Sequence, residues 1–269
     1  MTAPPPRVPP WAPPLLALQF LSRVPVPLLD RLEPVQVQAG MVKAVGWFPL
    51  VGTFIGTVTA ASLFGLAQLL PLAVAVIIAL IVEARLTGAF HEDAVADFCD
   101  AFGGGYTVED VRRIMKDSRI GSYGALGLGL AVALRAALLM SLPVAEQPLW
   151  SAAAIIGSAC FARLVVVAAM AFIPPVPTGT GLAKDIGGGV NAWTLLTAAL
   201  TACPALAALA LLQWPSILGA GALAALFLIW LRRMLMRRIG GSTGDCLGFA
   251  AYAGQLILLI AVVAANHGG

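Results

Sequence analysis

The chain has 269 residues, of which 60% are hydrophobic and only 11% are charged, and its formal net charge is +3. Soluble domains carry about 25% charged residues, so this composition excludes an ordinary soluble protein and predicts one that is embedded in a lipid bilayer. Lysine and arginine are not clustered with aromatic side chains, which excludes a nucleic-acid-binding surface.

The first residues of the chain are rich in proline and lack the continuous apolar core of a signal peptide. We expect residues 1–14 to form a disordered tail and residues 15–269 to form one membrane-embedded domain. The apolar stretch 15–21 is shorter than the roughly 20 residues that cross a bilayer, so it is predicted to lie at the interface.

Seven later stretches are apolar and long enough to span a bilayer. They run over 45–70, 72–90, 122–142, 150–173, 190–213, 215–233 and 247–265. Only Pro71 separates the first two stretches, so these are predicted to form a tight helical hairpin. The expected fold is therefore all-α, a polytopic integral membrane bundle of about seven transmembrane helices.

Lysine and arginine occur in alternate connections, and this pattern sets the expected orientation. They stand before the first span and in three connections, 91–121, 174–189 and 233–246. The connections near Pro71, at 143–149 and near Trp214 contain neither residue. Because loops rich in Lys and Arg stay on the inner side of a membrane, we expect a cytoplasmic N-terminus and a C-terminus outside.

A row of three aspartates follows the second predicted span. Asp93, Asp97 and Asp100 are spaced at i, i+4 and i+7, which places them within about 60° of one another on one helix face. Like charges at this spacing repel one another, and a hard cation would offset the repulsion. Oxygen ligands favour Mg²⁺ or Mn²⁺, and Mg²⁺ commonly shares its carboxylates with phosphate oxygens. The row predicts a metal site for a phosphorylated substrate; the alternative is a solvated acidic helix end.

Three neighbouring residues complete the candidate centre. Asp245 stands at the start of the last span, where it can join the metal ligands. His91 is a candidate to support a ligand, to contact substrate or to act as a general base; the alternative is a helix-end histidine satisfied by the backbone. Glu92 points away from the acidic face and is expected at the surface.

Segments on the same predicted side are candidates for phosphate binding. Three charged candidates precede a glycine turn: Lys116, Asp117 and Arg119. Arginine offers a bidentate fork to phosphate, although ordinary positive-inside charge is the alternative explanation. Two glycine-rich loops, 178–189 and 240–248 with Gly244, can also present backbone amides to phosphate, and neither matches a P-loop.

Four charged residues lie within the apolar stretches: Glu83, Arg85, Arg135 and Arg163. A charge near the centre of a bilayer costs about 3 kcal/mol or more, so it normally faces a cavity or a partner. Arg163 lies in the middle of its span and is predicted to line a polar pocket. Arg85 is close enough to the end of its span to extend its guanidinium to the interface.

At these motifs the chain resembles the cobalamin synthase family, the adenosylcobinamide-GDP ribazoletransferases. The matching segments are FLSRVPVP (20–27), GWFPLVG (46–52), LTGAFHEDAVADFCDAF (86–102), IMKDSRIGSYG (114–124) and GSTGDCLG (241–248). They stand in the family order and cover almost the whole chain. The usual acidic segment of the family reads HLDGLAD; here Glu92 and Ala94 replace Leu and Gly, and all three aspartates are retained.

The resemblance implies a reaction in the last steps of cobalamin biosynthesis. The ribose 3′-hydroxyl of α-ribazole, or of its 5′-phosphate, attacks the cobinamide-linked phosphate of adenosylcobinamide-GDP and releases GMP. The resemblance also implies a Mg²⁺-dependent enzyme of the bacterial inner membrane, with the active site facing the cytoplasm. Whether the ribazole is phosphorylated, and whether the protein forms a homo-oligomer, stays open.

The residues can be assigned to this reaction as follows. The expected metal ligands are Asp93, Asp97, Asp100 and Asp245. The expected contacts to phosphate and substrate are Lys116, Asp117, Arg119, Arg163 and Gly244. The expected proton acceptor is a carboxylate, Asp93 or Asp97, or else His91.

Three other functions are weighed against this one. CDP-alcohol phosphotransferases perform similar Mg²⁺-dependent chemistry, but their DGxxAR signature is absent. An ion-coupled transporter would place its site near the bilayer midplane and often shows inverted repeats, whereas these carboxylates gather at one surface. A scaffold for assembling a pathway would leave the aligned aspartates unexplained.

Overall fold

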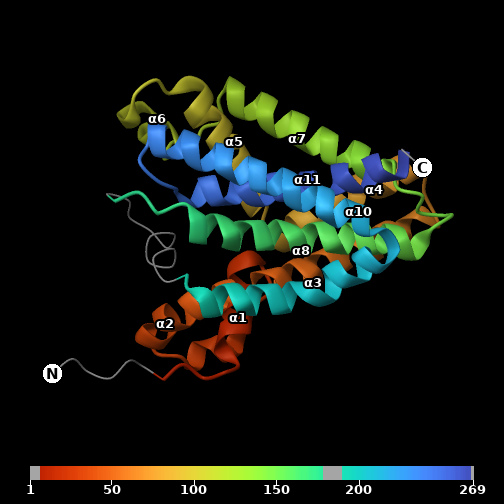
Figure 1. The fold of residues 1–269 in the computed structure, drawn as a ribbon, viewed down its shortest axis with the longest axis horizontal. Helices are drawn as coiled ribbons and strands as arrows, with labels where there is room; N and C mark the ends of the chain where they lie inside the picture. Colours follow the sequence, from red (N-terminus) through yellow and green to blue (C-terminus); the bar gives the residue numbers. More distant parts are fainter. Residues whose placement is uncertain (1–6, 178–189, 268–269) are drawn as a thin grey trace.

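The computed structural model describes residues 7–177 and 190–267, and helices make up most of this part of the chain, without any β-strand. Several long helices lie side by side along the molecule, as Figure 1 shows. The prediction of an all-α, polytopic membrane bundle is confirmed. One loop that was expected to bind phosphate, 178–189, lies outside the described residues.

The N-terminal region consists of short helices that precede the bundle. They are α1 (Ala12–Leu21), the 3-10 helix η1 (Pro27–Arg31), α2 (Pro34–Ala44) and the 3-10 helix η2 (Val45–Trp47). Helix α1 buries Ala12 and Pro13, so the predicted tail over residues 1–14 is wrong at its C-terminal end. Proline is tolerated there because the first amides of a helix have no intrahelical acceptor.

Helices α3 (Phe48–Ala67) and α4 (Leu72–Thr87) form the predicted hairpin around Pro71 and pack against each other. On another face, α3 lies very close to α8 (Pro148–Phe172). Gly52 permits this approach, because a Cβ atom at its position would overlap the backbone of α8. Small residues allow membrane helices to gain van der Waals contact in the absence of a strong hydrophobic driving force.

The chain turns sharply between α4 and α5 (Phe90–Gly104), and the two helix axes differ by 91°. Gly88 and Ala89 make the turn with φ angles of 75° and 56°. The left-handed conformation suits glycine but costs an alanine about 1–2 kcal/mol. The span predicted over 72–90 therefore ends too late, because residue 90 already belongs to the second helix.

The remaining described helices are α6 (Val108–Ile114), α7 (Ser122–Met140), α8, α10 (Ala192–Arg238) and α11 (Gly244–His267). Helix α10 has 47 residues, and Gln213 within it has non-helical angles of φ −156° and ψ 69°. A straight helix of that length would extend about 70 Å, more than twice the hydrocarbon thickness of a bilayer. Figure 1 shows that α10 doubles back at this kink, so that its two halves are antiparallel and both extend from the kink toward the same end of the molecule.

Five described helices are long and apolar enough to cross a membrane, or six if the bent pair α4–α5 counts as one span. The expected number of seven counts the two halves of α10 separately and stays a prediction. Figure 1 shows α2 and α6 near one end of the bundle, and the α3–α4 and α7–α8 connections at the other. Which end faces the cytoplasm also stays a prediction from the charge pattern.

Candidate active site

Segments that are far apart in the sequence meet at the end of the bundle that carries α6. The turn that leads into α7 contacts α5, because the amides of Gly121 and Gly124 donate hydrogen bonds to Asp100. The segment before α11 contacts the residue that follows α6, since the Thr243 hydroxyl lies 3.1 Å from the sulfur of Met115. Three of the segments that resemble the cobalamin synthase family are thereby brought together.

The end of α8 joins the same assembly. The amide of Ser242 donates to the carbonyl of Pro174 at 2.8 Å, and the amide of Val176 donates to the carbonyl of Ser242 at 3.1 Å. Arg238 at the end of α10 donates to the carbonyl of Gly105, next to the C-terminus of α5, at 2.5 Å. A cation at this position interacts favourably with the negative end of the helix dipole. The loop 240–248 is therefore anchored on both sides.

Helix α5 is the predicted acidic helix, and its apolar face is buried. Phe98 stacks on Phe249 of α11 with ring centroids 3.8 Å apart. Along the acidic row exposure falls steadily, so that Asp93 is exposed, Asp97 is half-buried and Asp100 is buried. The three aspartates thus stand in different environments, although their spacing places them on one face.

The carboxylate of Asp100 caps the N-terminus of α7. Its two oxygens accept hydrogen bonds from the amides of Gly121 at 2.6 Å and Gly124 at 2.7 Å. A Cβ atom at either glycine would overlap this carboxylate. A charged acceptor at the positive end of a helix dipole is a strong interaction. Asp100 was predicted as a metal ligand, and its contacts show that it also fixes α7 against α5.

We expect Asp100→Asn to destabilise the protein by about 1–3 kcal/mol, because an amide can accept from only one of the two N–H groups and turns a donor toward the other. Thermal unfolding in detergent would measure the loss. Asp93→Asn is the matched control on the same helix, and it should not lower the unfolding temperature because Asp93 is exposed. Equal unfolding temperatures for the two variants would contradict the capping role.

Asp245 joins the other end of the acidic row. It lies in the first turn of α11, and one turn later Gly248 packs so closely on α5 that a Cβ atom would overlap the methyl group of Ala94. The charges of Asp93, Asp100 and Asp245 all act on Asp97. The structure therefore brings together the predicted carboxylates of α5 and α11, which are about 150 residues apart in the sequence.

The arrangement of these carboxylates decides which metal they suit. Among the described residues, no three His, Cys, Asp or Glu side chains converge in a geometry that holds a metal ion by themselves. Mg²⁺ usually needs only one or two carboxylates, with water and phosphate oxygens as its other ligands. One or two of the carboxylates of Asp93, Asp97 and Asp245, which offer only oxygen, fit that kind of site.

The predicted phosphate contacts after α6 are partly engaged with each other. Arg119 makes a two-pronged contact with Asp117, with its Nε and Nη2 atoms 3.0 and 2.7 Å from the carboxylate oxygens. This pairing lowers the pKa of Asp117 to about 2. Lys116 is exposed, and so is Gly244 at the start of α11. Asp117 thus orients Arg119, whose side chain remains 87% exposed.

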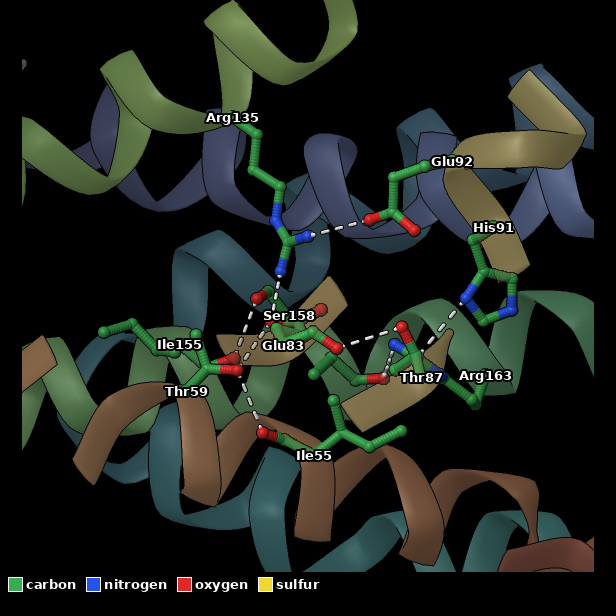
Figure 2. A network of polar contacts seen from close by, with 11 residues as sticks. Ile55, Thr59, Glu83, Thr87, His91, Glu92, Arg135, Ile155, Ser158 and Arg163 are labelled. Atoms are coloured by element: carbon green, nitrogen blue, oxygen red, sulfur yellow. Dashed lines mark hydrogen bonds and ion pairs between the residues drawn. The ribbon is translucent and has the colours of Figure 1, made fainter. Parts of the chain in front are cut away.

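A network of buried charges lies beneath the acidic helix (Figure 2). Arg135 of α7 is 2.6 Å from Glu83 of α4 and 3.6 Å from Glu92 of α5. The hydroxyl of Thr59 donates to the same oxygen of Glu83 at 2.6 Å. Glu92 was expected at the surface, but its side chain is only 18% exposed. That expectation was wrong because α7 supplies a cation to the side of α5 away from the acidic row.

His91 and Arg163 form a second buried contact, also drawn in Figure 2. Nη2 of Arg163 lies 3.3 Å from Nδ1 of His91, and Nη1 donates to the carbonyl of Ala159 at 3.3 Å. The Nδ1 atom of His91 is thus engaged by a side chain of α8. The alternative prediction, in which the backbone satisfies this histidine, is wrong for this nitrogen. Arg163 is 1% exposed, and the predicted contact between Arg163 and substrate stays a prediction.

Sequence reasoning overlooked two members of the network. Thr59 was not selected, and neither was Tyr252 of α11, whose ring centroid lies 5.7 Å from the guanidinium carbon of Arg135. The available signal was the presence of Glu83 and Arg135 in different spans, because opposite charges within a membrane pair with one another. The uncharged partners carry no comparable signal.

Known proteins resemble this chain over most of its length. The model of the family described as cobalamin-5-phosphate synthase matches residues 13–263. The adenosylcobinamide-GDP ribazoletransferase of Shewanella frigidimarina (strain NCIMB 400) is 36% identical over 259 residues, which cover 93% of each chain. The protein of the same name from Leptothrix cholodnii (strain ATCC 51168 / LMG 8142 / SP-6) is 37% identical over 267 residues, covering 90% of this chain and 93% of that one. No solved structure matches the chain.

Proposed function

We propose that this chain, which belongs to the cobalamin-5-phosphate synthase family, is an adenosylcobinamide-GDP ribazoletransferase. It transfers the phosphocobinamide group of adenosylcobinamide-GDP to α-ribazole or its 5′-phosphate and releases GMP. The observation that carries the proposal is the meeting of the acidic row, Asp245 and the turn 115–121 at one end of the bundle. Phosphoryl transfer needs such a combination of carboxylates for metal and cations for phosphate.

Two groups of residues have separate roles in this reaction, one in binding metal and the other in binding phosphate. One or two carboxylates among Asp93, Asp97 and Asp245 would hold Mg²⁺, which neutralises charge on the reacting phosphates when it is bound. Asp100, which was also predicted as a ligand, has both of its oxygens engaged by backbone amides. Lys116 and Arg119 provide positive charge for the phosphate of the leaving GMP. Both stand in the turn that follows α6, and the preceding residue contacts the segment that leads to Asp245.

The bond changes balance without a further reactant. The ribose hydroxyl oxygen bonds to the cobinamide-linked phosphorus while the bond from this phosphorus to the oxygen of the GMP phosphate breaks. The hydroxyl proton passes to a carboxylate of the acidic row. An ionised aspartate can only accept a hydrogen bond from the hydroxyl, which orients the nucleophile toward the phosphorus.

A turnover assay with purified protein in detergent tests the proposal. Adenosylcobinamide-GDP, α-ribazole and Mg²⁺ should yield GMP and adenosylcobalamin in equal amounts, and a chelator should abolish both. Omission of α-ribazole controls for simple hydrolysis. A parallel assay with a CDP-activated alcohol distinguishes the other phosphotransferase class, which would release CMP. Absence of GMP release in the complete mixture would refute the assignment.

We also propose that the protein lies in the bacterial inner membrane with the acidic row on the cytoplasmic side. The support is the concentration of Lys and Arg in alternate connections. With the native cysteines replaced, a cysteine at Glu146 should react with an impermeant thiol reagent in intact cells. A cysteine at Glu109 should react only after the cells are opened. The reverse pattern would invert the proposed orientation.

A further inference from the structure

The hydroxyl of Thr243 links the loop 240–248 to the turn 115–121. Its oxygen lies 3.1 Å from the sulfur of Met115, which follows α6, and 3.2 Å from the sulfur of Cys246 in the first turn of α11. A thioether sulfur carries no hydrogen, so the threonine is the donor in its contact with Met115. Among the described residues, this is the one hydrogen bond that joins the turn to the loop.

Each side of this contact is fixed to its own helix. Thr243 caps α11, because its hydroxyl accepts from the amide of Cys246 at 3.4 Å and its carbonyl accepts from the amide of Leu247 at 3.2 Å. The amide of Met115 donates to the carbonyl of Val111 at 3.0 Å, and the Met115 side chain packs against the hydrophobic core. The contact between Thr243 and Met115 therefore sets the separation of α6 and the start of α11.

The two segments carry residues that, in the proposed function, act on the same diphosphate. Asp245 comes two residues after Thr243 and lies beside the acidic row of α5. Lys116 comes directly after Met115, and Arg119 follows in the same turn. The two phosphorus atoms of a diphosphate share one bridging oxygen, so the carboxylate and the cations must be held at a matching separation. A misplacement of about 1 Å in such a site can lower a rate about 100-fold.

We propose that Thr243 is a positioning residue, whose hydroxyl holds the turn 115–121 against the segment that leads to Asp245 so that both reach one diphosphate. The inference rests on the proposed function. In this role Thr243 touches neither metal nor substrate, and it acts through Asp245 and Lys116. Because a thioether is a weak acceptor, loss of the bond should change the spacing of the two segments more than the stability of the fold.

A distance measurement tests the positioning without depending on catalysis. The two cysteines that are not buried are first removed as Cys99→Ala and Cys203→Ala. Spin labels are then attached at Lys116→Cys and Gly244→Cys, since both positions are exposed and a Cβ atom at Gly244 would meet no neighbouring atom. We expect one narrow distance distribution in this parent protein and a broader one after Thr243→Val. An unchanged distribution would overturn the inference.

Steady-state kinetics of the unlabelled protein tests the consequence. Thr243→Val keeps the size of the side chain but lacks the hydroxyl, and it should lower kcat/KM for adenosylcobinamide-GDP about 10-fold, mainly by raising its KM. The KM for α-ribazole, which carries no diphosphate, should stay unchanged. Thr243→Ser retains the hydroxyl and should restore most of the activity. A purely structural role would lower kcat through the amount of folded enzyme and leave both KM values unchanged.

A double-mutant cycle and a matched control complete the test. Met115→Leu removes the acceptor sulfur from a side chain of similar size, so it should reproduce the effect of Thr243→Val. The two changes together should be no worse than either alone, because the same bond is lost in each case. Thr201→Val is the control, since the Thr201 hydroxyl donates to the carbonyl of Gly46 at 2.8 Å and joins α10 to η2 instead. It should change neither the kinetics nor the distance distribution.

The outcomes separate this inference from the proposed function. Wild-type kinetics in Thr243→Val, a failure of Thr243→Ser to restore activity, or independent losses in the cycle would overturn the inference and leave the proposed function standing. A folded wild-type protein that releases no GMP would refute the proposed function and with it the role of Thr243 in catalysis. The distance measurement would still decide whether Thr243 holds the two segments together.

Discussion

Replacing Asp97 with Asn is expected to lower the rate of GMP release by about 100- to 1,000-fold while the protein stays folded. Asp97 is half-buried in the centre of the acidic row, and Asp93, Asp100 and Asp245 all act on it electrostatically. The amide has nearly the same shape as the carboxylate but lacks the charge that attracts Mg²⁺. Loss of like-charge repulsion should even stabilise α5 by about 0.2–0.5 kcal/mol.

Two measurements check this expectation together. Steady-state GMP release at several Mg²⁺ concentrations reports catalysis, and thermal unfolding in detergent reports the fold. Glu109→Gln is the matched control, because Glu109 is exposed on the neighbouring helix α6 and outside the acidic row. Full activity in Asp97→Asn would remove Asp97 from the proposed metal site, and a large drop in its unfolding temperature would assign it a structural role instead.

Replacing Arg135 with Met is expected to destabilise the protein by about 3–5 kcal/mol, the usual cost of removing one partner of a buried ion pair. The change leaves Glu83 buried, and among the described residues only the hydroxyl of Thr59 then remains as a hydrogen-bonding side chain for its carboxylate. It also removes the cation beside Glu92. Because Arg135 contacts a glutamate on each side of the bend at Gly88 and Ala89, the loss should also loosen the angle between α4 and α5.

A second substitution isolates the charge effect. Glu83→Gln in the Arg135→Met background removes the stranded charge and should recover a large part of the lost stability, as chemical unfolding in detergent would show. Arg85→Met is the matched control, since Arg85 is exposed on the same helix as Glu83 and should tolerate the change. If Arg135→Met unfolds no more readily than Arg85→Met, then the ion pair does not hold the bend.

The buried ion pairs of Arg135 matter for function because they support the bend between α4 and α5, which orients the acidic row. The helix that carries the acidic row lies at 91° to α4, and a left-handed alanine makes part of the turn between them. Arg23 supports the turn from outside, because its amide donates to the carbonyl of Leu86 at 2.7 Å and its guanidinium lies against Gly88. The buried ion pairs support it from inside. The acidic row is therefore oriented by contacts from several helices.

Local features of the sequence determined the class of the protein and the acidic face of α5. The low charge content predicts a membrane protein because bilayers exclude charge, and the structure confirms long apolar helices. The i, i+4, i+7 spacing places Asp93, Asp97 and Asp100 on one face because helical periodicity depends only on nearby residues. The hairpin at Pro71 follows for a similar reason, since the fixed φ angle and the missing N–H of a proline act on the residues next to it in the chain.

Tertiary structure alone decided what the individual side chains contact. Asp100 meets amides 21 and 24 residues away, and His91 meets an arginine 72 residues away, so each partner depends on how α5 packs against α7 and α8. Periodicity gave Glu92 the correct side of the helix, but only packing shows that Arg135 buries that side. The helical repeat specifies the direction in which a side chain points. Its environment depends on which residues from elsewhere in the chain pack against it.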